Sequence, residues 1–210
     1  ASDVYKRQIF APQAAGTGNY FGQSVAMNED ASLLAVSAPE TNSNHGQYWV
    51  YDISDKNNIP DGNSSIASIA SVTYSAGEYY ASSLSMTGTK VLAASLKIPH
   101  KAYLTDISDG SNITMERPTA YASGRFGENV HVFGNNGSPI SAIGCPRTNL
   151  GGHNEAGAVH VYDDTGSLIR TIENPTPSYS EWFGSVVRVV SSDTIIIAAR
   201  SGADDAQYKG

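Results

Sequence analysis

The first recognisable motif of the chain is Phe21-Gly22-Gln23-Ser24-Val25, and a similar motif recurs as Phe126-Gly127-Glu128-Asn129-Val130. Two looser copies read Tyr80-Ala81-Ser82-Ser83-Leu84 and Phe183-Gly184-Ser185-Val186-Val187. The four openings stand 59, 46 and 57 residues apart, which is close to the length of one propeller blade. Self-similarity at this period indicates a repeat protein, in which each repeat is one supersecondary unit.

The first repeat predicts four short strands. Residues 23–27 alternate polar and apolar, residues 28–31 have turn composition, and residues 33–36 form an apolar run that ends in Ser-Ala-Pro. Residues 47–52 are rich in aromatic and β-branched side chains, and residues 66–74 alternate again. Because these runs are strand-sized and separated by turn residues, we expect four antiparallel strands per repeat.

The other repeats follow the same pattern with different fidelity. The third repeat matches the first position by position, and Cys145 falls where the pattern places a small buried residue, so we expect this cysteine to be a packing residue. The second repeat keeps the apolar alternation and loses the signature. The repeats divide the chain into the last strand of a preceding blade (1–18), a blade (19–77), a degenerate blade (78–122), a blade (123–177) and an incomplete blade (178–210).

Composition supports an all-β fold and excludes two classes of partner. The chain has 210 residues, 40% of them apolar, with 20 glycines and 9 prolines, which suits a packed core of short strands and frequent turns. Its net charge is −7 and its 13 Lys and Arg residues are scattered, so no nucleic acid partner is expected. The apolar runs are too short to cross a bilayer, and we expect no membrane span.

The repeats resemble FG-GAP repeats, the blades of the integrin α-subunit head. The pattern Phe-Gly-x-Ser-Val, a turn, an apolar run ending in small residues and Pro, a loop and an aromatic strand is met most closely by residues 21–51 and 126–162. The resemblance implies a β-propeller of four-stranded antiparallel blades. Such a propeller has about four blades here, or these blades are part of a larger seven-bladed one. The resemblance also implies an extracellular role in adhesion or ligand binding.

One departure from the family concerns calcium. Calcium-binding FG-GAP blades carry an Asp-rich loop between the first two strands, whereas the turns here read Asn28-Glu29-Asp30-Ala31, Thr87-Gly88-Thr89, Gly134-Asn135-Asn136-Gly137 and Ser191-Ser192-Asp193. Too few carboxylates are present for a hard cation. The acidic pairs Asp163-Asp164 and Asp204-Asp205 are typical of solvated loops. The chain is therefore similar to the calcium-free branch, and we expect no metal and no cofactor.

The two ends of the chain do not coincide with the boundaries of a repeat. Residues 6–10 have the spacing of a last strand, and residues 206–210 resemble the start of a third strand. Three explanations remain open: a part of a longer propeller, a four-bladed ring closed by the N-terminal strand, or strand pairing between chains that builds a filament.

Two sets of polar residues are candidates for function. Three sequons, at Asn63, Asn112 and Asn136, are potential glycosylation sites and favour an extracellular location. Loops that would gather on one rim of the propeller predict a binding surface for a protein or glycan, because loops on a rigid scaffold carry recognition. The rim residues are His45, His153, Asn154, Glu155, Asp204 and Asp205.

No catalytic motif stands out. A Gly-x-Ser-x-Gly elbow, a phosphate loop and a His-Glu-x-x-His pattern are all absent from the sequence. The five histidines have no metal-ligand spacing, and we expect His131 and His160 to be surface or hydrogen-bonded side chains. We therefore expect a non-catalytic binding protein, with a structural subunit of an extracellular filament as the alternative. A propeller glycosidase or lyase is the third reading, for which the sequence offers no pair of carboxylates.

Overall fold

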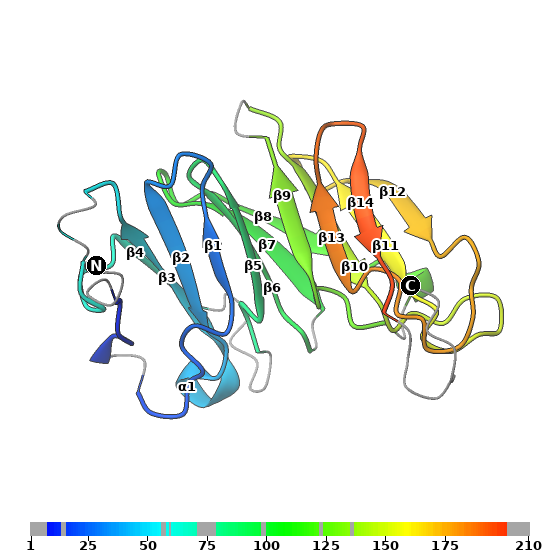
Figure 1. Ribbon diagram of the computed structural model, residues 1–210, viewed down its shortest axis with the longest axis horizontal. Coiled ribbons are helices and arrows are strands. Elements are labelled where there is room, and N and C mark those ends of the chain that lie inside the picture. Colours follow the sequence, from blue (N-terminus) through cyan, green and yellow to red (C-terminus); the bar gives the residue numbers. More distant parts are fainter. Residues whose placement is uncertain are drawn as a thin grey trace, which may run out of the picture.

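The protein is an all-β chain of short antiparallel strands. The computed structural model describes residues 8–13, 16–55, 58, 60–70, 79–97, 100–121, 124–134 and 137–200. Within these residues the helical elements are few and short, such as α1 (Thr41–Asn44) and a 3-10 turn (Thr119–Tyr121). Figure 1 shows strands along the whole length of the molecule.

The strands form four sheets in chain order. The first sheet contains β1 (Val25–Met27), β2 (Leu33–Ala38), β3 (Gln47–Asp52) and β4 (Ala67–Ala70). The second contains β5 (Ser83–Thr87), β6 (Lys90–Ala94), β7 (Lys101–Asp106) and β8 (Asn112–Glu116). The third contains β9 (Val130–Phe133), β10 (Ile140–Cys145), β11 (Ala158–Tyr162) and β12 (Leu168–Glu173). The described part of the fourth sheet is the hairpin of β13 (Val186–Val189) and β14 (Ile195–Ala198).

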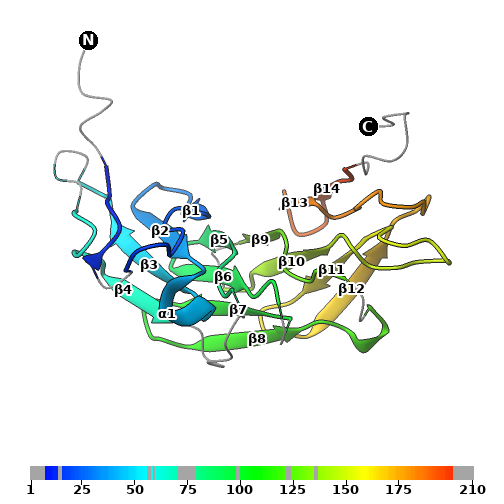
Figure 2. The same ribbon diagram turned by 90° about the horizontal axis from the view of Figure 1, so that it is seen from below.

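Each sheet is a meander, as the repeat pattern predicts. Neighbouring strands pair antiparallel. Equivalent positions pair in the first and third repeats, because Val25 pairs with Val36 and Val130 pairs with Ile143. Three four-stranded sheets confirm the predicted antiparallel repeat unit. Figure 2 shows the four sheets in an open arc, with β1 and β13 at its two ends, so the described residues do not form a closed ring.

The first strands of the sheets lie beside one another along the arc. β5 contacts both β1 and β9, and β9 contacts β13. Side chains join these strands to the next sheet: the Leu84 N–H donates to Ser24 Oγ at 3.0 Å, and the Val132 N–H donates to Ser85 Oγ at 3.0 Å. His131 Nδ1 accepts from the Val189 N–H on β13 at 3.1 Å, which confirms that the His131 side chain is hydrogen-bonded.

The second repeat folds into a complete sheet although its signature is weak. Ala81 stands where the other repeats have glycine, and it adopts a positive φ of 61°, the backbone region that Gly22, Gly127 and Gly184 occupy. Every residue of β5 is buried between the first and third sheets. Packing on both faces therefore compensates for an alanine in a conformation that favours glycine.

The hydrophobic core consists of layers between successive sheets. Tyr80, Phe126 and Phe183 each pack in the layer between their own sheet and the preceding one. Cys145 is fully buried in the layer between the second and third sheets, which confirms the predicted packing role. Burial raises the pKa of the Cys145 thiol to about 11. The opening aromatic of the second, third and fourth repeats thus fills the space between two sheets.

The outer face of the first sheet is covered by the segment before it. Ile9 and Phe21 pack against a cluster that includes Trp49 and Tyr51, and the Phe21 and Trp49 ring centroids are 5.8 Å apart. Residues 8–12 have no strand pairing, so the last strand of a preceding blade in residues 1–18 stays a prediction.

His160 differs from the sequence-based expectation. The ring is fully buried on β11, with Nδ1 3.0 Å from Thr171 Oγ1 and Nε2 without a hydrogen-bond partner. It is therefore neither a surface residue nor fully hydrogen-bonded. The reason is tertiary: Tyr121 and Phe126 cover the ring, with centroids 4.8 and 5.9 Å from its own.

Candidate functional site

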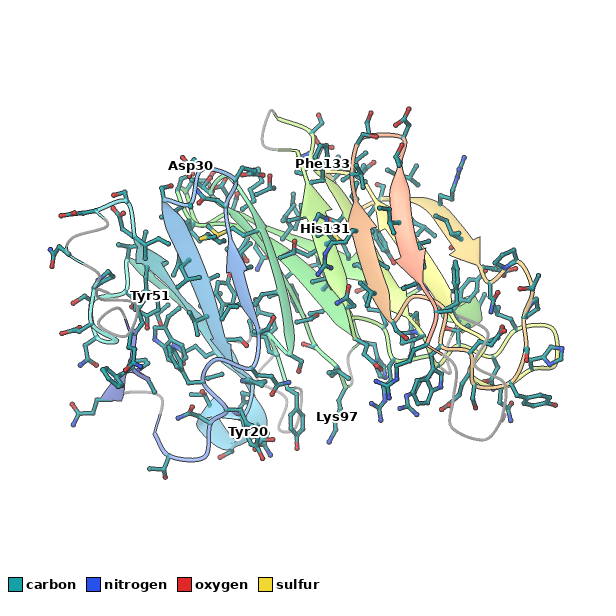
Figure 3. The ribbon with its side chains drawn as sticks, viewed as in Figure 1. Tyr20, Asp30, Tyr51, Lys97, His131 and Phe133 are labelled. Atoms are coloured by element: carbon teal, nitrogen blue, oxygen red, sulfur yellow. The ribbon has the colours of Figure 1, made fainter. Side chains whose placement is uncertain are left out.

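The loops that join the second and third strands of the first and third sheets lie on one edge of the arc. α1 and the loop of residues 146–157 are both at the lower edge of Figure 1. Figure 3 places Tyr20 and Lys97 at this edge and Asp30 and Phe133 at the opposite one. The predicted rim residues His45, His153, Asn154 and Glu155 belong to these loops, whereas Asp204 and Asp205 lie outside the described residues.

A backbone clamp holds the first of these loops on the next sheet. The N–H groups of Tyr79 and Tyr80 donate to the carbonyl oxygens of Asn44 and His45 at 3.0 and 3.1 Å. Gly46 follows with a φ of 85°, and a Cβ there would lie 2.2 Å from the Tyr80 carbonyl oxygen. His45 is therefore held by its backbone as part of the contact between two sheets.

The same clamp recurs in the loop of residues 146–157. The N–H groups of Trp182 and Phe183 donate to the carbonyl oxygens of Glu155 and Ala156, both at 3.1 Å. Gly157 has a φ of 92°, and a Cβ there would lie 2.2 Å from the Phe183 carbonyl oxygen. This loop is consequently fixed against the opening of the fourth sheet, a rigid support for its side chains.

Three side chains interlock on top of this clamp. The Glu155 carboxylate accepts from Arg147 Nη1 at 2.9 Å and from the Trp182 indole Nε1 at 2.8 Å. The Arg147 guanidinium carbon lies 4.7 Å from the centroid of the Trp182 ring. The hydrogen bond from the indole, together with the hydrogen bond and charge of Arg147, lowers the pKa of Glu155. The carboxylate is thus ionised at neutral pH.

Further cations surround this group. The Arg200 guanidinium carbon lies 4.8 Å from the centroid of the Trp182 ring. Glu128 Oε2 is 3.9 Å from Arg147 Nε and 3.8 Å from Arg125 Nη1. We call the set of side chains at this edge the rim cluster. Its members are Arg125, Glu128, Arg147, His153, Glu155, Tyr179, Trp182 and Arg200.

His153 and Asn154 border the same site. The His153 and Tyr179 ring centroids are 5.1 Å apart in an edge-on arrangement, and the Tyr179 hydroxyl donates to the Gly152 carbonyl oxygen at 3.3 Å. The Asn154 carbonyl oxygen accepts from the Ser180 N–H at 3.0 Å. The structure therefore brings His153, Asn154 and Glu155 together with the segment of residues 179–182, and leaves His45 in a separate loop.

Sequence reasoning did not single out Arg147, Trp182 or Arg200. These residues come from three segments that only packing brings together. One signal was present: Trp182 directly precedes Phe183, as Tyr20 precedes Phe21 and Tyr79 precedes Tyr80. All three preceding aromatics have a positive φ, between 52° and 55°. An aromatic at this place in the repeat is consequently directed by an unusual backbone conformation.

The described residues contain no group of three or more His, Cys, Asp or Glu side chains that could hold a metal ion. The first hairpin turn is stabilised by a side chain, because Asn28 Oδ1 accepts from the Ser32 and Leu33 N–H groups at 3.0 and 2.9 Å. Glu29 of the same turn accepts from the Gly88 N–H of the next sheet at 2.9 Å. The side-chain oxygens of Asn28 and Glu29 thus accept hydrogen bonds from backbone N–H groups.

Two of the three sequon asparagines lie in the described part of the chain. Asn63 and Asn112 are both exposed, Asn63 in the loop before β4 and Asn112 as the first residue of β8. Asn63 Oδ1 accepts from the Gln13 N–H at 3.0 Å. Asn136 lies outside the described residues. Glycosylation of these residues stays a prediction.

A second feature is a groove beside the fourth sheet. It has a volume of about 450 Å³ between β14 and the third sheet. Its apolar lining consists of Ile140, Val161, Ile169, Ile172 and Ile195. In the other three sheets the corresponding edge of the second strand pairs with a third strand, namely β3, β7 or β11. Among the described residues, that edge of β14 has no paired strand.

No protein-family model matches the chain, and no curated protein matches it. Within the described residues, no helix has the length and apolar character needed to span a membrane.

Proposed function

We propose that this protein is a non-catalytic binding module of the FG-GAP propeller type, which contacts a protein or a glycan through its rim. The observation that carries the proposal is the interlocked group of Arg147, Glu155 and Trp182. Two loops from different sheets present this group on a backbone clamp, so a ligand would meet side chains that are already in place. The extracellular setting rests on the resemblance to FG-GAP repeats and on the sequons.

The chemistry of the site favours binding over catalysis. The Glu155 carboxylate has both oxygens engaged, one by Arg147 and one by Trp182, at 2.9 and 2.8 Å. A carboxylate held in this way, with a lowered pKa, is a poor general acid or base at neutral pH. Arg and Trp are enriched among the residues that dominate binding energies.

The test is a screen of the whole chain against arrays of glycans and matrix proteins. Trp182→Ala should abolish the binding that the unmodified chain shows. Phe133→Ala is the matched control, because Phe133 is an exposed aromatic on the opposite edge (Figure 3). A null result on both arrays, or equal loss with both variants, would count against a binding rim.

A second candidate, a structural subunit of an extracellular filament, is supported by the edge of β14. The groove lies beside β14, where the other sheets have a third strand. Ile196 on β14 is 61% exposed. Such an edge is a template for pairing with a strand of another chain. Negative-stain microscopy at rising concentration tests this candidate: Ile196→Lys should suppress any filaments, and isolated particles alone in the unmodified protein would dismiss it.

A further inference from the structure

Within the described residues, one cation of the rim cluster, Arg200, forms no ion pair with a carboxylate. Arg147 has Glu155 at 2.9 Å and Glu128 at 3.9 Å. Arg200, in contrast, is exposed, and its contact within the described part of the chain is with the Trp182 ring. Among the described residues its guanidinium N–H groups have no hydrogen-bond acceptor, so these donors could bind a ligand.

The local charge of the cluster has the opposite sign to that of the chain. Three guanidinium groups (Arg125, Arg147 and Arg200) face two carboxylates (Glu128 and Glu155), whereas the whole chain carries −7. A chain with this net charge repels polyanions in general. The excess positive charge of these named side chains would favour an anion at this place on the rim.

The Arg200 side chain is arranged for recognition of an anion that presents two oxygens side by side. Its guanidinium lies over the Trp182 ring, and cation–π contact restricts the rotamers of an otherwise flexible side chain. The fork of N–H donors matches the two oxygens of a carboxylate or sulfate group. A restrained donor loses less conformational entropy when it binds, which favours affinity.

A second feature of the rim cluster is an exposed aromatic side chain. Tyr179 is 62% exposed, and its position is fixed by the hydroxyl bond to the Gly152 carbonyl oxygen and by the His153 ring. A Cβ at Gly152 would meet nothing within 4 Å, so the space around this part of the loop is open. An exposed, braced ring beside open backbone offers a flat platform for a sugar ring, with its polar edge in water.

We infer that the rim cluster binds a polysaccharide that carries carboxylate or sulfate groups. Arg200 pairs with the anionic group, and Tyr179 supports a neighbouring sugar ring. This inference rests on the proposed binding function and names its ligand class. An exposed guanidinium with no ion pair among the described residues, together with an exposed aromatic ring, favours a charged glycan over an acidic protein, because a protein interface needs a buried apolar centre.

Titration calorimetry with three polymers tests the inference: polygalacturonate carries carboxylates, dextran sulfate carries sulfates, and dextran is neutral. We expect binding to one or both of the charged polymers and none to dextran. Arg200→Ala should weaken that binding about tenfold, since a charge-assisted bidentate contact is lost. Arg170→Ala is the matched control, because Arg170 is an exposed arginine on β12, away from the rim, and we expect it to leave affinity unchanged.

The outcomes separate this inference from the proposed function. A preference for polygalacturonate or for dextran sulfate identifies the anion and supports the inference. Equal binding of dextran, or equal effects of Arg200→Ala and Arg170→Ala, overturns it and leaves a glycan-binding rim in place. Binding to proteins alone overturns it as well, whereas the absence of any ligand on polymers and arrays removes both proposals.

Discussion

The protonation of His160 should destabilise the fold as the pH falls. The ring is fully buried between the second and third sheets, with Nε2 lacking a hydrogen-bond partner. Burial, and to a smaller extent the positive charge of Arg117, lowers the pKa of His160 from 6.5 to about 4. The native state therefore holds the neutral ring, while the unfolded chain takes up a proton near pH 6.5.

The sign and size follow from proton linkage. Between pH 6.5 and 4 the unfolded state binds more protons than the native state at this residue, so the free energy of unfolding decreases as the pH falls. A pKa difference of one unit corresponds to about 1.4 kcal/mol, so the shift from 6.5 to about 4 removes about 3 kcal/mol in all. Full stability is expected above pH 6.5, and the whole loss below pH 4.

Urea unfolding of the unmodified chain and of His160→Phe, between pH 3.5 and 7.5, measures this effect. Carboxylates also titrate in this range, as do His100 and His131, whose pKa values burial lowers. They are present in both proteins and cancel in the difference. The difference in free energy of unfolding should change by about 3 kcal/mol in favour of His160→Phe as the pH falls. A difference independent of pH, or His160 ring resonances that titrate near 6.5 in the native protein, would refute the reasoning.

Two further predictions concern the backbone clamp and the buried thiol. Gly157→Ala should lower the free energy of unfolding by about 2–4 kcal/mol, because the new Cβ would lie 2.2 Å from the Phe183 carbonyl oxygen at a φ of 92°. Gly152→Ala, at a φ of 85° in open space, should cost only about 1 kcal/mol in the same urea titration. Cys145, with a pKa of about 11, should react with a thiol reagent at pH 8 only after unfolding, and rapid labelling of the native protein would contradict its burial.

The strands of the first and third repeats were predictable because their signals are local. Residues 47–52 form β3 as expected from their aromatic and β-branched content, and residues 140–145 form β10. For the second repeat, only the spacing and the apolar alternation predict a blade. The second sheet is complete because the first and third sheets pack on its two faces, and no short stretch of sequence contains that information.

The candidate site was predictable in part. The polarity of residues 151–155 identified the loop with His153, Asn154 and Glu155, which the structure places at the rim. The partners of this loop come from distant positions, since Glu155 meets Trp182 through a hydrogen bond 27 residues apart in sequence. No periodicity or motif in the sequence predicts the contact between Glu155 and Trp182.

By itself, the sequence determined the all-β class, the order of the strands and the antiparallel meander, because alternation and turn residues act over a few neighbours. Only the tertiary structure decided which side chains are buried and which charged groups come into contact. Burial lowers the pKa of His160 to about 4, and hydrogen bonds from Trp182 and Arg147 lower the pKa of Glu155. Such properties are set by packing between segments far apart in the chain, where burial and hydrogen bonding shift pKa values.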